Sequence, residues 1–191
     1  MVAFALMRYY IALVFAIFAA GCGGAKKDPS APETPVEHFS LRSPGRFEEI
    51  ALEGERFFSP EIEIVRYDNE YRGHVRSLTV DLRLSENLLE GTIGNARTEL
   101  HIEKLPDGFG VRGMFGGRIG QFAMQGDRLE GRLGGRAFVL RRSEDNPTVY
   151  RSIVGAGELS GRGSTELTVP ASFAKRPPEQ QAALLSLFLG R

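Results

Sequence analysis

Apolar and other residues alternate along much of the chain, and the alternation is clearest between Leu89 and Leu140. One pattern occurs there three times: an alternating run that ends at glycine and is soon followed by a second alternating run. The three copies begin at Leu89, Val111 and Leu129, and a looser copy covers residues 159–163. Alternation with a period of two residues, interrupted by glycine-containing turns, is typical of consecutive β-hairpins.

The same alternation predicts further strands on both sides of these repeats. Residues 78–84 form the clearest one, because every second side chain is apolar and the others are polar. Residues 39–58 show the least clear pattern, and turn signals such as Pro106-Asp107-Gly108 separate the runs. Between residues 38 and 175 we count about ten to twelve short strands with no helix between them. Because short connections join antiparallel neighbours, the strands are expected to form a meander.

A long meander leaves unpaired edges unless its sheet curls. Each repeat places a glycine, at Gly91, Gly113 and Gly131, between two apolar residues of one face, and glycine lets a strand bend sharply. We therefore predict an all-β domain over residues 38–175 in which a curved antiparallel meander forms an up-and-down barrel or a half-closed barrel. A two-sheet β-sandwich is the alternative. A transmembrane β-barrel needs strands of about 9–11 residues with a lipid-facing apolar side. It is disfavoured because the strands expected here are shorter and their polar face carries many Glu and Arg residues.

Residues 176–191 are predicted to form a short C-terminal helix. Pro177 and Pro178 fit the first helical turn, and residues 184–189 are rich in leucine. About ten residues are too few for a stable isolated helix, so this helix must pack on another surface. It is expected either to cover one end of the sheet as a lid or to lie in the groove of a partner protein.

The first 21 residues have the organisation of an export signal. Arg8 is their only charged residue, and the apolar run from Tyr9 to Ala20 is shorter than the roughly 20 residues that span a bilayer. Small residues, Ala19-Ala20-Gly21, lead directly to Cys22, which is the only cysteine of the chain. This stretch resembles the lipobox of bacterial lipoproteins, with Ala19 at the position where leucine is usual.

The resemblance covers residues 1–22 and implies a lipid anchor. It implies that a diacylglyceryl group is attached to the Cys22 thiol, that the signal peptide of residues 1–21 is removed, and that the new amino group is acylated. A thiolate suits this alkylation, and two or more acyl chains give a stable anchor. Gly23 follows the cysteine where aspartate would retain the protein at the inner membrane, so we expect the outer membrane, facing the periplasm. Residues 22–37, rich in proline and small residues, predict a flexible tether.

Composition and charge exclude several classes of function. Basic and acidic residues balance at 24 each, which does not favour nucleic-acid binding. A single cysteine cannot form an intramolecular disulfide. The histidines, His38, His74 and His101, lack the spacing of metal ligands. Residues 108–113 match G-x-G-x-x-G, but a turn precedes them and a strand follows, so no nucleotide cofactor is expected.

No set of catalytic residues stands out, so we interpret the chain as a non-enzymatic cell-envelope lipoprotein whose β-domain is a binding, adaptor or structural module. Its expected partners are the membrane, through Cys22, and an envelope protein or glycan. No metal or cofactor is expected. The alternative is a carrier or sensor of a small apolar ligand, with a lipocalin-like curved barrel. Its candidate pocket lining is the inward-facing set Ile93, Phe115, Phe122 and Leu133.

Overall fold

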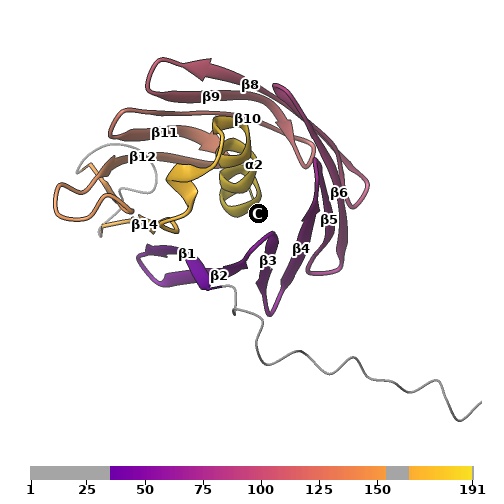
Figure 1. Ribbon diagram of the computed structural model, residues 1–191, viewed down its shortest axis with the longest axis horizontal. Coiled ribbons are helices and arrows are strands. Elements are labelled where there is room, and N and C mark those ends of the chain that lie inside the picture. The colour runs from indigo at the N-terminus through magenta and orange to yellow at the C-terminus, as the bar shows by residue number, and fades with distance from the viewer. Residues whose placement is uncertain (1–34, 154–163, 191) are drawn as a thin grey trace, which may run out of the picture. The chain divides into compact units, whose positions relative to one another are not determined.

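The computed structural model describes residues 35–153 and 164–190, which form a closed antiparallel β-barrel around an α-helix (Figure 1). Fourteen strands follow one another around the barrel in chain order, and the last pairs with the first. The predicted all-β meander with a short C-terminal helix is confirmed, and the barrel is closed rather than half-closed or split into a sandwich. The strands are β1 (Val36–Ser43), β2 (Arg46–Glu53), β3 (Arg56–Ser59), β4 (Ile62–Tyr67), β5 (Glu70–Val75), β6 (Leu78–Ser85), β7 (Leu88–Ile93), β8 (Ala96–Leu105), β9 (Gly108–Phe115), β10 (Arg118–Gln125), β11 (Arg128–Leu133), β12 (Arg136–Arg142), β13 (Val149–Ser152) and β14 (Glu166–Thr168).

The barrel contains more strands than the sequence predicted. Strand β3 has four residues, which are too few for a clear alternation. Strand β1 begins at Val36, two residues before the predicted start of the domain, and pairs with β2 on one side and β14 on the other. The signal peptide, Cys22, most of the tether and the strand expected near residue 160 lie outside the described residues.

The helix α2 (Pro178–Leu189) lies inside the barrel (Figure 1). Every residue from Ala182 to Leu189 is buried, as expected for a helix that is apolar on all sides. At its start, the Glu179 carboxylate is 3.8 Å from Lys104 Nζ at the end of β8. At its other end, Gly190 packs against the backbone of Gly134, in the turn between β11 and β12. The helix therefore runs along the lumen, which differs from both predicted placements, the lid and the partner-bound helix.

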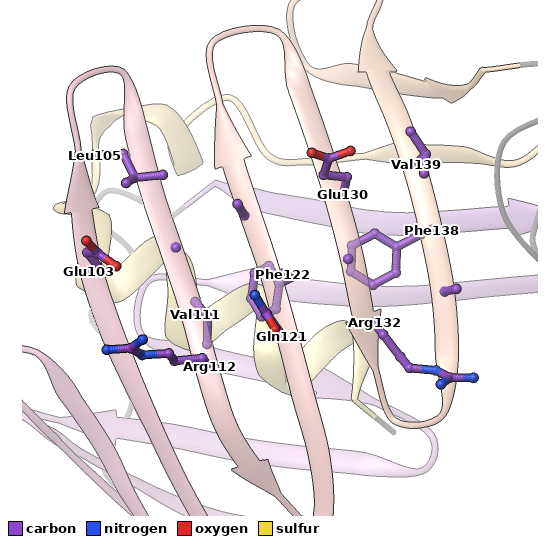
Figure 2. A pocket seen from close by; sticks show the side chains of 14 residues that line it. Glu103, Leu105, Val111, Arg112, Gln121, Phe122, Glu130, Arg132, Phe138 and Val139 are labelled. Carbon is purple, nitrogen blue, oxygen red and sulfur yellow. The ribbon is translucent and has the colours of Figure 1, made fainter.

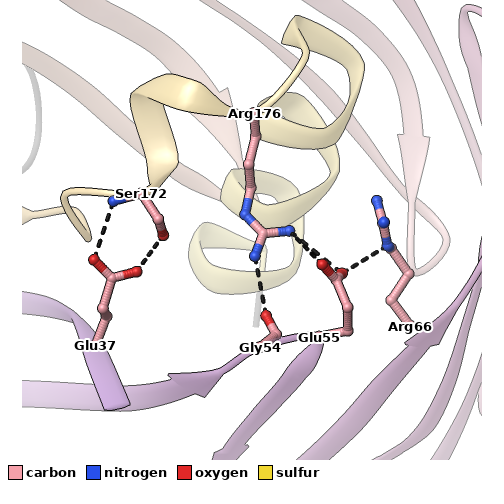
Figure 3. Close-up of polar contacts among 6 residues, drawn as sticks. All are labelled: Glu37, Gly54, Glu55, Arg66, Ser172 and Arg176. Carbon is pink, nitrogen blue, oxygen red and sulfur yellow. Dashed lines mark hydrogen bonds and ion pairs between the residues drawn. The ribbon is translucent and has the colours of Figure 1, made fainter. Parts of the chain in front are cut away.

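Polar contacts fix the point where the chain enters the lumen (Figure 3). A short 3₁₀-helix, η3 (Phe173–Lys175), precedes α2. Arg176, which follows it, donates at 3.2 Å to the Glu55 carboxylate, and Arg66 Nε lies 2.7 Å from the same carboxylate. The backbone N–H of Ser172 donates at 3.0 Å to the Glu37 carboxylate. These contacts tie the start of α2 to strands β1 and β4 and to the turn between β2 and β3.

The glycine at the centre of each repeat has a backbone conformation that other residues rarely adopt. The φ angles are 137° at Gly91, 143° at Gly113 and 146° at Gly131. A β-carbon added at any of the three would overlap a carbonyl oxygen of the neighbouring strand. These positions require glycine because it adopts positive φ without strain and lets the neighbouring strand approach closely.

Replacing Gly113 with alanine is expected to lower the free energy of unfolding by about 2–6 kcal/mol, because backbone strain and overpacking each cost about 1–3 kcal/mol. Gly126→Ala is the matched control, since Gly126 has φ +60° but open space around its β-position. It should lose only about 1–2 kcal/mol. Guanidinium-induced unfolding of the full chain measures both losses. Equal losses of unfolding free energy in the two variants would contradict the claim that position 113 requires glycine because the neighbouring strand lies so close.

Candidate binding site at one end of the barrel

Six hairpin turns lie at the end of the barrel where α2 finishes. We call this end the mouth; its turns join β1 to β2, β3 to β4, β5 to β6, β7 to β8, β9 to β10 and β11 to β12. A hollow of about 940 Å³ opens at the mouth, and α2 contributes to its floor through Leu187 and Gly190. The tight packing of Gly190 on Phe115 and Gly134 fixes the depth of this floor.

One wall of the mouth hollow is apolar. It is formed by inward-facing side chains at the mouth ends of β5, β6, β7 and β9, namely Val75, Leu78, Ile93 and Phe115. Leu78 is 48% exposed, although it shares a strand face with the buried Val80. The wall therefore presents apolar surface to solvent inside a concave site, where a ligand could cover it.

The rest of the hollow carries arginines, and this arginine wall meets the apolar wall where Arg118 on β10 pairs with Phe115 on β9. Arg46 on β2, Arg118 on β10 and Arg136 on β12 each lie on the strand face that points into the barrel, as does Glu48 on β2. The Glu48 carboxylate contacts Arg46 and lies 3.7 Å from Arg136 Nη1. Arg118 donates at 3.4 Å to the carbonyl of Gly134 and has no carboxylate within ion-pairing distance among the described residues. Three guanidinium groups thus share this wall with one inward carboxylate.

The electrostatics of the wall are unfavourable for the arginines. Burial lowers the pKa of Arg46, and the positive charges of Arg136 and Arg76 lower it further. Burial also lowers the pKa of Arg136. Part of this arrangement has a structural use: α2 ends at the mouth, has no basic residue in its last turn, and leaves partially negative carbonyl groups there. The cationic wall therefore stands at the partially negative end of the helix and presents positive charge to the hollow.

The structure separates the four residues predicted to line a ligand pocket. Ile93 and Phe115 line the mouth hollow. Phe122 and Leu133 are buried in the core that surrounds α2, and Leu133 has no exposed surface. Among the described residues, these four therefore do not line one lumenal pocket, because α2 occupies the lumen.

Sequence reasoning missed the arginines of the wall because it assigned Arg and Glu to the solvated face of each strand. The sequence nevertheless contains a signal for two of these arginines. Arg136 is separated by even spacing from the apolar Phe138 and Leu140, and Arg118 is related in the same way to Phe122 and Met124. Even spacing places residues on the same face of a strand. An arginine that shares a strand face with buried apolar residues is therefore expected to point into the barrel.

A second, shallower hollow lies on the outer face of strands β8–β12 (Figure 2). Its volume is about 670 Å³. Small residues such as Gly110 and Ala123 form its base, and charges of both signs, including Glu103, Arg112 and Glu130, surround them. Phe122 is also at its base. The mixture of charges favours no particular ligand, so the mouth hollow is the better candidate site.

Among residues 35–153 and 164–190, no group of three or more His, Cys, Asp or Glu side chains is placed to hold a metal ion. His38 Nδ1 lies 3.1 Å from Glu49, and His101 lies 3.6 Å from Glu99, on different strands of the barrel. No helix within the described part of the chain is both long and apolar enough to cross a membrane.

Comparisons of the chain with protein-family models, with curated proteins and with solved structures find no match.

Proposed function

We propose that the protein is a lipid-anchored, non-enzymatic binding module of the bacterial cell envelope. In this proposal Cys22 carries the anchor in the outer membrane, residues 22–37 act as the tether, and the barrel binds an envelope component in the periplasm. The resemblance of residues 19–22 to a lipobox supports the anchor. The mouth supports the binding role.

The observation that carries the binding role is the apolar wall of the mouth hollow, together with exposed apolar side chains on its rim. Phe47, Leu78 and Ile119 are 56%, 48% and 84% exposed, and they lie at the turns that begin β2, β6 and β10. Apolar surface that lines a concave site marks an interaction site more often than single scattered side chains do. The same end supplies arginine, which is enriched at binding interfaces.

The non-enzymatic part of the proposal rests on the chemistry of the mouth. Its inward charged groups on β2, β10 and β12 are three guanidinium groups and the Glu48 carboxylate, which contacts two of them. Guanidinium groups remain protonated and bind anions, and a carboxylate held by two arginines is a poor base. This set of groups suits binding better than proton transfer.

The anchor is tested by Cys22→Ser. The substitution is expected to abolish incorporation of labelled palmitate and to release the protein from the membrane fraction, because no other cysteine can take the lipid. Gly23→Asp is the matched control: it should keep the label and move the protein from the outer to the inner membrane fraction. Retention of the palmitate label by Cys22→Ser would contradict the proposed anchor.

The binding site is tested by photo-crosslinking in the cells that naturally make the protein. A photoreactive phenylalanine analogue at Phe47, Leu78 or Ile119 is expected to give a discrete adduct with an envelope component. The control position is Tyr67, which is 61% exposed at the opposite end of the barrel. Adducts that are absent at the mouth, or equally abundant from Tyr67, would remove the support for a binding site at the mouth.

A further inference from the structure

We propose that the mouth hollow binds an anionic amphiphile, a molecule that joins one apolar chain to one anionic headgroup. This inference rests on the proposed binding function and names the class of ligand. The two walls of the hollow carry it, because each wall suits one half of such a molecule and neither half alone satisfies both walls.

The apolar wall would contact the apolar chain of the ligand. Leu78 is half-exposed, Ile93 and Val75 are only partly buried against the core, and Phe115 continues the same surface toward the floor. Covering this surface would be favourable by about 25 cal/mol for each Å² of apolar area removed from water. The volume of about 940 Å³ lies within the roughly 300–1,000 Å³ range of small-molecule sites.

The arginine wall would bind the anionic headgroup of the ligand. Arg46, Arg118 and Arg136 face the hollow together with Glu48. The other lining carboxylates, Glu49 and Glu61, pair with His38 and Arg76. An anion placed between them would reduce the mutual repulsion of the guanidinium groups and would accept paired hydrogen bonds from them. Arg118 is the clearest donor, because its described contact is a single hydrogen bond to the Gly134 carbonyl.

The floor sets how the ligand lies. Leu187 and Gly190 of the α2 end close the hollow toward the lumen, and the backbone contact of Gly190 with Gly134 leaves no space between helix and barrel there. The chain of the ligand therefore lies across the mouth against the apolar wall. The apolar chain of the ligand does not extend along the barrel axis, as it could in a barrel without a lumenal helix.

A protein partner fits these observations less well. Phe47 and Ile119 lie on the outward faces of β2 and β10, where a flat protein surface can reach them. Arg46, Arg118 and Arg136 lie at the same end of the barrel but on the inward strand faces. A partner that covered only the rim would bury three guanidinium groups with Glu48 as their one inward carboxylate, and leaving the excess positive charge unpaired is costly. The occupant of the hollow must therefore bring the anionic group inside.

The test is isothermal titration of the full chain carrying Cys22→Ser, which cannot hold the proposed acyl anchor. The probes are dodecanoate and dodecyl phosphate below their micelle concentrations. Dodecyltrimethylammonium and inorganic phosphate are the comparison probes, since the first keeps the chain with a cation and the second keeps the anion without a chain. We expect saturable one-to-one binding of both anionic amphiphiles and binding at least about tenfold weaker for both comparison probes, a difference of about 1.4 kcal/mol.

Variants assign the binding to the two walls. Arg136→Gln and Leu78→Ser are each expected to weaken dodecanoate binding about tenfold, and Arg118→Gln is the second arginine variant if Arg136→Gln does not fold. Arg72→Gln is the matched control, because Arg72 is an exposed outward residue of β5 that pairs with Glu70. It should bind dodecanoate as the parent chain does.

Several outcomes would overturn the inference. Equal affinity for the cationic amphiphile would show an apolar site without charge recognition, and phosphate binding as tight as dodecyl phosphate would show an anion site alone. No binding of any amphiphile, together with crosslinks from the mouth to an envelope protein or glycan, would overturn this inference and leave the proposed function standing. No amphiphile binding and no crosslink would overturn both.

Discussion

The width of the barrel is the constraint on which the rest of the structure depends. An eight-stranded barrel is just wide enough for its own side chains to fill, whereas barrels of sixteen or more strands enclose a channel. Fourteen strands lie between these limits, so inward side chains alone would leave a wide lumen. The chain fills the lumen with its own helix, and the buried face of every strand is matched to α2 or to the side chains around it.

Several features follow from a helix placed inside a barrel. The helix is apolar on all sides, and its one buried polar side chain, Ser186, donates back to the Ala182 carbonyl at 2.8 Å. The helix entry must be held at one end, which the Arg176 and Glu55 contacts achieve. The helix terminus at the other end closes the lumen and places its carbonyl groups beside a cationic wall. The candidate site is therefore a result of how the lumen is filled.

The sequence specifies the local elements of this fold more clearly than their long-range arrangement. The repeats around Gly91, Gly113 and Gly131 predict hairpins, curvature and the positions where strands bend, because these depend on neighbouring residues. Closure depends on the three residue pairs that join β1 to β14, far apart in the chain, and no local pattern encodes them. The position of α2 was encoded in part, since a segment as uniformly apolar as residues 182–189 must be surrounded. Finding the mouth arginines required both the strand phase and the closure of the barrel, and the sequence left a closed and a half-closed barrel as alternatives.

The most direct test of this account is whether α2 occupies the lumen in solution. Ala183 on α2 has no exposed surface, whereas Ile119 at the mouth is 84% exposed. In a chain carrying Cys22→Ser, a cysteine is introduced by Ala183→Cys or by Ile119→Cys, and its reaction with a bulky maleimide is followed. The account predicts that position 119 reacts rapidly in the folded protein and that position 183 reacts only after unfolding in guanidinium. Equally fast labelling of both positions in the folded protein would contradict it.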